Sequence, residues 1–291
     1  MKVVLIGANG QLGTDLNRTL AAQGTSVKPF THNDLDVRDT GKIENVISSA
    51  QPDAVISTAA FHKVEVCETE PETSFSVNSI APRNLALACR RHNAVLVNFS
   101  TDYVFDGAKR QPYLEEDRPS PLNVYGVSKL AGEYMLALTW ERHFIVRTCG
   151  LYGVAGSAGK GGNFVETMLK KGAAAEEIRV VSDQVLTPTF TGDLAEAVAQ
   201  LIKTDAYGLY HVTAEGECSW HQFAQKIFEL EGLRPKLSPV SSSEFASPVR
   251  RPSYSVLSKE KVSRLGIKMS AWEEGLRRYL AARRQKKATP V

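Results

Sequence analysis

The sequence is poor in cysteine, and nothing in it would use the few cysteines together. The 291 residues include Cys67, Cys89, Cys149 and Cys218. Their spacing matches neither a metal-ligand motif nor the framework of a disulfide-rich domain. We therefore expect no metal site, and we expect the thiols to stay reduced, as they do in the cytoplasm.

A long apolar run and a strong charge of either sign are also missing. Met1 and Lys2 lead into an apolar stretch that ends at Ile6, which is too short for a signal peptide or a membrane span. The net charge is only +3, and the one dense basic block, residues 283–287, lies where a chain is usually frayed and solvated. We therefore expect neither a membrane nor a nucleic-acid partner.

The chain begins with the pattern of a strand, a tight turn and a helix. Residues 2–6 are mostly apolar, and Gly7, Gly10 and Gly13 follow at intervals of three. In a dinucleotide-binding turn the first glycine permits the turn, the second admits a pyrophosphate, and the third lets helix and strand pack closely. A glycine-rich turn without a ligand is the alternative, but the position between strand and helix favours a nucleotide cofactor at the helix N-terminus.

Apolar runs and helical patterns then alternate through the first half of the chain. Further strands are expected at 26–30, 53–57, 94–99 and 143–147. With helices between them, they predict an α/β fold with a Rossmann-like, doubly wound parallel sheet over residues 1–150. Residues 151–291 are expected to form a smaller C-terminal α/β substrate domain, with the strand and helix of segment 178–203 returning to the Rossmann sheet.

The end of the second expected strand bears on the choice of cofactor. NAD-selective sites usually carry Asp or Glu there, to hydrogen-bond the ribose 2′-OH. Here Thr31 and His32 follow the strand, and Asp34 and Asp36 come slightly later. No arginine is obviously placed to receive a 2′-phosphate. We expect NADPH, with NADH as a second cofactor.

The residues that point to chemistry are Tyr125 and Lys129, four apart in a helical pattern. They would share one face of the helix. A free tyrosine has a pKa of ~10, and a neighbouring cation lowers it, so the pair would act as a general acid or base. Thr101 follows the fourth strand, where its hydroxyl could reach a substrate oxygen. A solvated helix face and a turn cap are the structural alternatives.

Several short motifs together resemble the extended short-chain dehydrogenase/reductase family and, within it, the dTDP-4-dehydrorhamnose reductases. They lie at 7–13, 59–60, 64–71, 77–78, 100–105, 121–126, 129–133, 147–148, 163–164, 183–184, 188–189 and 251–252. The resemblance covers nearly the whole chain. It implies reduction of the C4 keto group of dTDP-4-dehydro-L-rhamnose to dTDP-L-rhamnose by NADPH, and it allows a homodimer.

The resemblance also implies roles for individual residues. Tyr125 would protonate the C4 oxygen, Lys129 would lower the pKa of Tyr125 and hold the nicotinamide ribose, and Thr101 would hydrogen-bond the same sugar oxygen. The residues implied to contact the cofactor are Gly7, Asn9, Gly10, Gln11, Leu12, Gly13, Asp36, Val37, Ala59, Ala60 and Asn78. Those implied to contact the substrate are Val104, Phe105, Asn163, Phe164, Gln184 and Pro188.

Two other functions fit the same fold. One is an NDP-sugar epimerase or dehydratase of the same superfamily. A dehydratase typically has Glu where this chain has Tyr103, and Thr31 and His32 argue against an epimerase that retains NAD. The other is a non-catalytic, NADP-binding regulatory subunit, which would not require the acid–base pair. Related reductases often have Trp where this chain has Gly150.

Overall fold

The centre of the molecule is a sheet of six parallel strands. The computed structural model describes residues 1–156, 162–174, 177–245, 247 and 249–288. The strands are β1 (Lys2–Ile6), β2 (Ser26–Phe30), β3 (Ala54–Ser57), β4 (Val95–Thr101), β5 (His143–Thr148) and β10 (Gly208–His211). Their order is β10-β5-β4-β3-β1-β2. After β2 is added on one side of β1, the next strands are added on the other side, beginning with β3. Ligands bind at such a topological switch point in open α/β sheets.

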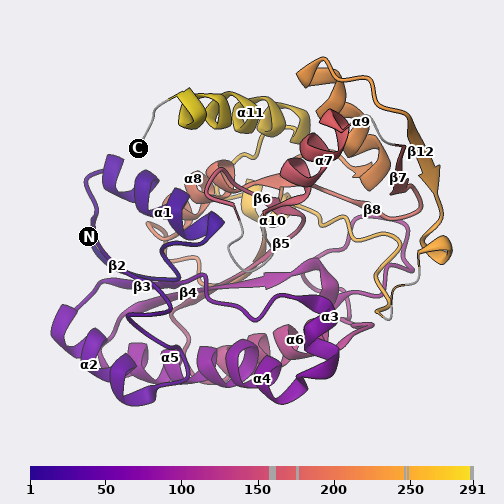
Figure 1. The fold of residues 1–291 in the computed structure, drawn as a ribbon. Coiled ribbons are helices and arrows are strands. Elements are labelled where there is room, and N and C mark those ends of the chain that lie inside the picture. The colour runs from indigo at the N-terminus through magenta and orange to yellow at the C-terminus, as the bar shows by residue number, and fades with distance from the viewer. Residues whose placement is uncertain (157–161, 175–176, 246, 248, 289–291) are drawn as a thin grey trace.

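Helices cover both faces of this sheet (Figure 1). One face carries α1 (Gln11–Ala22) and α8 (Thr191–Leu201); the other carries α2 (Thr40–Ala50), α5 (Ala81–Arg91) and α6 (Val124–Ala137). Strand residues alternate between the two cores, with Val3 and Leu5 facing α1 and Val4 and Ile6 facing the other layer. The predicted doubly wound α/β fold is therefore confirmed.

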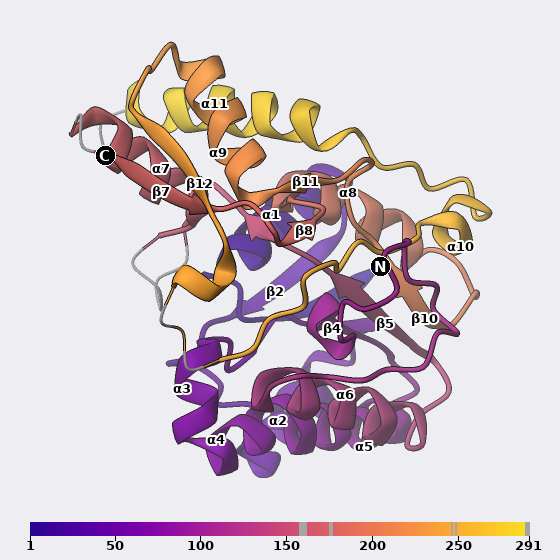
Figure 2. The same ribbon diagram turned by 90° about the vertical axis from the view of Figure 1, so that its right-hand side faces the viewer.

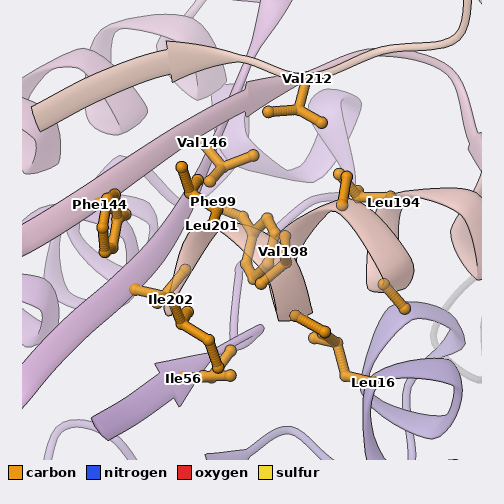
Figure 3. Packing of buried hydrophobic residues seen from close by; sticks show 14 of the residues in the cluster. Leu16, Ile56, Phe99, Phe144, Val146, Leu194, Val198, Leu201, Ile202 and Val212 are labelled. Carbon is orange, nitrogen blue, oxygen red and sulfur yellow. The ribbon is translucent and has the colours of Figure 1, made fainter. Parts of the chain in front are cut away.

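The core on the α1 and α8 side is formed by branched and aromatic side chains (Figure 3). Leu16 of α1 and Leu194 and Val198 of α8 pack against the strands. The strand residues that meet them include Ile56, Phe99, Phe144 and Val146. Side chains fill this layer, so a ligand has no room within it. The place for a ligand is the edge of the sheet where the strands have their carboxyl ends.

The helical segment after β3 is interrupted. α3 (Val64–Thr69) and α4 (Pro71–Phe75) lead into a π-helix, η1 (Ser76–Ile80), before α5 begins. The helical pattern of residues 72–92, taken alone, predicts one continuous helix. The π turn packs on α6 at Gly132, where a Cβ atom would lie 2.1 Å from the carbonyl oxygen of Asn78. The two elements therefore meet backbone to backbone, and such π turns are frequent at functional sites.

The second half of the chain has a core of its own, which includes Phe223 and Tyr279. The helices that form it are α7 (Phe164–Ala173), α9 (Trp220–Glu231) and α11 (Trp272–Ala288), which lie near one another at the top of Figure 2. The short helix α10 (Glu260–Ser263) instead adds Val262 to the core on the α1 and α8 side. The strand pairs of this half are β7 (Ile178–Val181) with β12 (Leu237–Val240), β8 (Val185–Leu186) with β11 (Cys218–Ser219), and β6 (Leu151–Tyr152) with β9 (Thr189–Phe190). Short 3₁₀ turns lie at η2 (Asp102–Val104) and η4 (Ser242–Glu244). None of the helices in the described ranges combines the length and apolar composition needed to cross a bilayer.

The path of segment 178–203 differs from the expected one. β7 pairs in parallel with β12 and does not join the central sheet, so the prediction that this strand returns there is wrong. Helix α8 does pack against the sheet, beside α1. The added strand is instead β10, which pairs with β5. A short apolar run predicts a strand but not its partner. The domain boundary at residue 150 stays a prediction.

Candidate active site

The three residues predicted to be catalytic come from the end of β4 and the start of α6. Thr101 is the last residue of β4, Tyr125 lies in the first turn of α6, and Lys129 follows one turn later. α6 begins at this point because the side chain of Asn123 caps it and accepts a hydrogen bond from Gly126 N at 2.8 Å. The side chains of Thr101 and Tyr125 are hydrogen-bonded to each other. The end of β4 and the start of α6 therefore form one site.

A buried carboxyl group lies behind Thr101. Asp102 is 3% exposed, and its Oδ1 accepts a hydrogen bond from Thr101 Oγ1 at 3.0 Å. Its Oδ2 accepts one from Cys149 Sγ at 3.0 Å, and Ser255 is a third partner. Burial raises the pKa of Asp102, because a carboxylate loses hydration inside the protein. This group fixes the orientation of the Thr101 hydroxyl.

The surroundings of Tyr125 favour its protonated form. Burial is the main cause that raises the pKa of the phenol, and the charge of Asp102 adds to it, while the hydrogen bond with Thr101 opposes it. The sequence had predicted a lowered pKa from the cation one turn away. In the protein without ligands, desolvation outweighs that effect, so the expected direction is wrong for this state. The phenol thus holds its proton at neutral pH.

Lys129 is a cation in an environment that disfavours charge. Its side chain is buried, and burial lowers its pKa to about 8, although the negative charge of Glu133 one turn further along α6 partly offsets this. The ammonium is therefore still mostly present at neutral pH. The Nζ of Lys129 makes no hydrogen bond to another residue in the described part of the chain. Its three donors could therefore be used by the hydroxyl groups of a ligand.

Glu133 belongs to a buried ion pair that joins α6 to the sheet. Arg147 of β5 donates from Nε to Glu133 Oε1 at 2.9 Å and from Nη2 to Oε2 at 2.6 Å. Ser100 of β4 also donates to Glu133. Arg147 and burial lower the pKa of His211 to about 3, so that ring is neutral. This network holds β4, β5, β10 and α6 in register behind the catalytic residues.

Asn78, which was predicted to contact the cofactor, holds protein segments together. It is 1% exposed, and its Oδ1 accepts from Phe61 N at 2.9 Å. Its Nδ2 donates to Phe61 O at 2.9 Å and to Ser128 Oγ at 3.0 Å. With these partners the amide is satisfied by the protein, and its contact with the cofactor stays a prediction. Asn78 ties the segment after β3 to the helix that carries Tyr125 and Lys129.

The glycine turn has the geometry that a pyrophosphate needs. Gly7 has a φ of 79°, and Gly13 lies so close to it that a Cβ atom there would be 2.1 Å from Gly7 O. Gly10 is the N-cap of α1 and makes no side-chain cap. The first N–H groups of α1 therefore remain available for an anion. These features fit a dinucleotide cofactor.

A cavity of about 320 Å³ opens beside this turn. Six of the residues predicted to bind cofactor line it, namely Gly7, Asn9, Asp36, Val37, Ala59 and Ala60. Leu12 does not, because its side chain is buried in the core, and only its backbone could take part. The side chain of Gln11 also points elsewhere, since its Oε1 accepts hydrogen bonds from Gly153 N at 3.0 Å and Asn163 Nδ2 at 3.2 Å.

A larger cavity, of about 1050 Å³, lies between the end of β4 and the second half of the chain. Tyr103 lines it, and its ring meets that of Tyr125 edge to face with centroids 5.9 Å apart. Its lining also includes the adjacent rings of Phe164 and Trp220 and the side chains of Gln184, Arg179, Arg250 and Arg251. Aromatic rings and arginines together suit a ligand with a flat base and phosphate groups.

Four residues predicted to contact substrate do not line the described part of this cavity, and their contact with substrate stays a prediction. Val104 and Phe105 are fully buried in a small core with Tyr113, and Phe105 stacks on that ring. Asn163 is the N-cap of α7, and Pro188 is buried next to Gly150. None of the four lines the large cavity as the structure describes it. A motif places its residues near a site, but burial decides which of them face it.

Comparison with known protein families agrees with this geometry. The model of the family described as "RmlD substrate binding domain" matches residues 1–285. The chain belongs to this family.

Individual relatives of this RmlD-family chain are similar over their full length. It is 42% identical over 282 residues to the spore coat polysaccharide biosynthesis protein SpsK of Bacillus subtilis (strain 168), covering 97% of this chain and 98% of the relative. It is 35% identical to the dTDP-4-dehydrorhamnose reductase of Escherichia coli (strain K12), covering 96% and 97%. The crystal structure of dTDP-4-dehydrorhamnose reductase from Bacillus anthracis in complex with NADP has a TM-score of 0.92 and 39% identity, covering 97% and 99%.

Several residues of this RmlD-family site were not predicted from the sequence. Tyr103 was noted only as an argument against dehydration, and Arg179 and Trp220 were not singled out. Arg250 and Arg251 stood out in the sequence as a basic pair before a proline, which was the available signal. Asp102 follows β4 and Cys149 follows β5, so no spacing could have joined them.

Proposed function

We propose that this protein reduces the C4 keto group of dTDP-4-dehydro-L-rhamnose to dTDP-L-rhamnose, with NADPH as the reductant. The observation that carries the proposal is the set of Thr101, Tyr125 and Lys129 at the end of β4, next to Tyr103 of the large cavity. The names of the relatives support the substrate, and the NADP in the Bacillus anthracis structure supports the cofactor.

The residues of this chain would move one proton and hold two ligands. Tyr125 is the general acid, because its phenol keeps its proton at neutral pH until a stronger base is placed against it. The sugar oxygen becomes that base as C4 is reduced, and it takes the phenolic proton. When bound, NADPH supplies the hydride that C4 accepts. The C4 carbonyl thus gains a hydride and a proton and becomes an alcohol. Tyr125, which gave the proton, is left as a phenolate.

Lys129 and Thr101 would support that transfer. The Lys129 ammonium lies one turn from Tyr125 and stabilises the phenolate that the transfer leaves. The same ammonium has donors to spare for ribose hydroxyls. In the protein without ligands the Thr101 hydroxyl donates to Asp102, so its proton would turn to the sugar oxygen when substrate binds. It would then hold that oxygen within reach of the phenol of Tyr125. The phenolate then recovers a proton from water.

The test is a kinetic assay of the Tyr125→Phe variant. We expect the wild-type protein to consume one NADPH per keto-sugar, followed by the absorbance of the reduced nicotinamide. The variant should lose roughly 10²–10⁴-fold in kcat, the usual contribution of a general acid. Its affinity for NADPH should change little, since the ring remains.

An unchanged kcat in Tyr125→Phe would contradict the mechanism. Sugar conversion without net consumption of NADPH would point to an epimerase instead. Bound NADPH with no conversion of any keto-sugar would favour a regulatory subunit. A homodimer and a cytoplasmic location stay predictions, which size-exclusion chromatography with light scattering and cell fractionation would check.

A further inference from the structure

We propose that Arg38 and His32 bind the 2′-phosphate of NADPH and that Asp36 holds Arg38 in position for it. The proposal rests on the proposed function, because it assumes that NADPH occupies the cavity of about 320 Å³. Both side chains line that cavity. The sequence alone had shown no arginine obviously placed for this phosphate, and the relatives' names do not say which residues hold it.

The end of β2 fixes where the adenosine ribose must lie. Gly7 N and Ala8 N, in the phosphate-binding turn, donate to Phe30 O at 2.8 and 3.0 Å. In a Rossmann unit the ribose next to the pyrophosphate lies beside the end of this second strand. His32 follows β2 by two residues, and Arg38 reaches the same cavity from the loop before α2. The 2′ position therefore faces this pair.

The carboxylates nearby are already engaged. Asp34 accepts hydrogen bonds from Thr31 N at 2.8 Å and Thr31 Oγ1 at 2.7 Å, and it does not line the cavity as the structure describes it. Asp36 does line the cavity, but Arg38 donates to it from Nε at 3.0 Å and from Nη2 at 2.5 Å. An NAD-selective site would offer such a carboxylate to the ribose 2′-OH. Here the carboxylate of Asp36 is already bound by Arg38.

This pairing prepares Arg38 for an anion. Asp36 stays ionised, since the hydrogen bond with Arg38 lowers its pKa to about 2. It holds one edge of the guanidinium, while Nη1 makes no hydrogen bond to any residue in the described ranges. The Arg38 side chain is about half exposed and lines the cavity. A guanidinium held by one edge can offer its other donors to phosphate oxygens.

The test compares two ligands that differ only in this phosphate. Isothermal titration calorimetry would measure the affinities for 2′,5′-ADP and 5′-ADP, neither of which carries nicotinamide or reacts. The wild type should prefer 2′,5′-ADP by roughly tenfold to hundredfold, the range expected for charge-assisted hydrogen bonds. In Arg38→Gln the preference should fall to within about threefold, with the affinity for 5′-ADP unchanged.

Three further variants separate direct binding from positioning. Arg91→Gln is the matched control, because Arg91 is also an exposed arginine paired with a carboxylate, that of Glu44, but does not line the cavity. It should keep the full preference. His32→Gln should reduce the preference less than Arg38→Gln does. Asp36→Asn should also reduce it, because Arg38 loses the charge that orients it.

Equal affinities for the two ligands in the wild type would overturn the proposal, and so would an undiminished preference in Arg38→Gln. An unchanged preference in Asp36→Asn or His32→Gln would remove the role of that residue. Failure of the proposed function looks different: 2′,5′-ADP would still be preferred, but the keto-sugar would not be reduced. Conversely, equal affinities combined with turnover of the keto-sugar by NADH would leave the reductase standing and remove only this site.

Discussion

At the scale of single residues, the ammonium group of Lys129 has opposite effects on stability and on function. It is buried, and its pKa is lowered to about 8 from 10.5. Because the folded-state pKa lies below the unfolded one, the charged lysine destabilises the fold. The cost is fully present below pH 8, where both states are protonated, and disappears as the pH rises from 8 to 10.5. Function nevertheless needs the charge.

Lys129→Met should therefore stabilise the protein without ligands while impairing it as an enzyme. We expect the free energy of unfolding at pH 7 to rise by about 1–3 kcal/mol, and the gain over wild type to vanish near pH 10.5. Denaturant titrations at pH 7 and at pH 10.5 measure this difference. Cofactor affinity and kcat should both fall, since one ammonium serves both. A loss of stability at pH 7 that disappears at pH 10.5 would instead show that the attraction between Lys129 and Glu133 outweighs the cost of burying the ammonium.

At the scale of elements, the position of α6 depends on a glycine, Gly132, that lets its backbone approach a neighbouring turn. Gly132 sits against the π turn η1, with no room for a methyl group beside Asn78 O. Asn78 in turn bonds to Ser128, between Tyr125 and Lys129 on the sequence of α6. Any outward shift of α6 would therefore move both catalytic side chains together.

Gly132→Ala should lower both stability and turnover. The added methyl group must displace backbone, so we expect a loss of about 1–3 kcal/mol of unfolding free energy, as for other overpacked sites. The value of kcat should fall more than KM changes, because Tyr125 and Lys129 move while the large cavity is lined from elsewhere. Chemical denaturation and steady-state kinetics measure the two effects.

The matched control for this change is Gly41→Ala in α2. A Cβ atom there would meet only the side chain of Asp39, at an ordinary 3.5 Å. Alanine favours a helix over glycine by up to about 1 kcal/mol, so this variant should be as stable as the wild type or more so. Equal effects of the two substitutions would mean that the contact with η1 does not position α6.

How well each element could be predicted depended on whether its cause was local. The strand, turn and helix at residues 2–22 follow from an apolar run and three glycines, and they are present as expected. The π turn at Ser76–Ile80 was missed because its helical periodicity differs little from that of an α-helix. The burial of Val104 and Phe105 was not predicted, because it depends on Tyr254 and Leu257, which are far away in the sequence.

At the scale of the whole molecule, a chain of hydrogen bonds crosses from the first loop to the last helix. Asn163 Nδ2 donates to Gln11 Oε1 at 3.2 Å and to Tyr279 OH at 3.3 Å. Glu166 of α7 also pairs with Tyr279 and Arg283 of α11. The cofactor turn, the wall of the large cavity at α7 and the C-terminal helix are thus held as one unit.

Asn163→Asp should weaken this unit while keeping the cap of α7. The new oxygen still accepts from Glu166 N, but it faces the acceptors Gln11 Oε1 and Gly153 O, where the amide had donated. We expect a loss of about 1–3 kcal/mol in unfolding free energy, because buried acceptors lose their donor. Asn45→Asp, on the exposed face of α2, is the control and should be neutral. Equal stability of both variants, measured by denaturant titration, would contradict the link.

The overall architecture could be predicted from the sequence, but the contacts that join the two halves of the chain could not. Alternating strands and helices sufficed for the doubly wound sheet, and the motifs sufficed for the family. Nothing in the spacing of Gln11, Asn163 and Tyr279 showed that they meet. Similarly, two partners of Asp102 are Cys149, directly after β5, and Ser255 in the second half. Such contacts depend on the final packing of distant segments.

The bonds between Gln11, Asn163 and Tyr279 also set an order during synthesis. A ribosome delivers the glycine turn long before α11, and domains generally fold as they emerge. The segment around Gln11 therefore waits for Asn163 and then Tyr279 before this chain of bonds is complete. A nascent chain stalled before Tyr279 could form the central sheet, yet it would hold its cofactor turn without this support. Completion of the binding site thus requires that α11 has been synthesised.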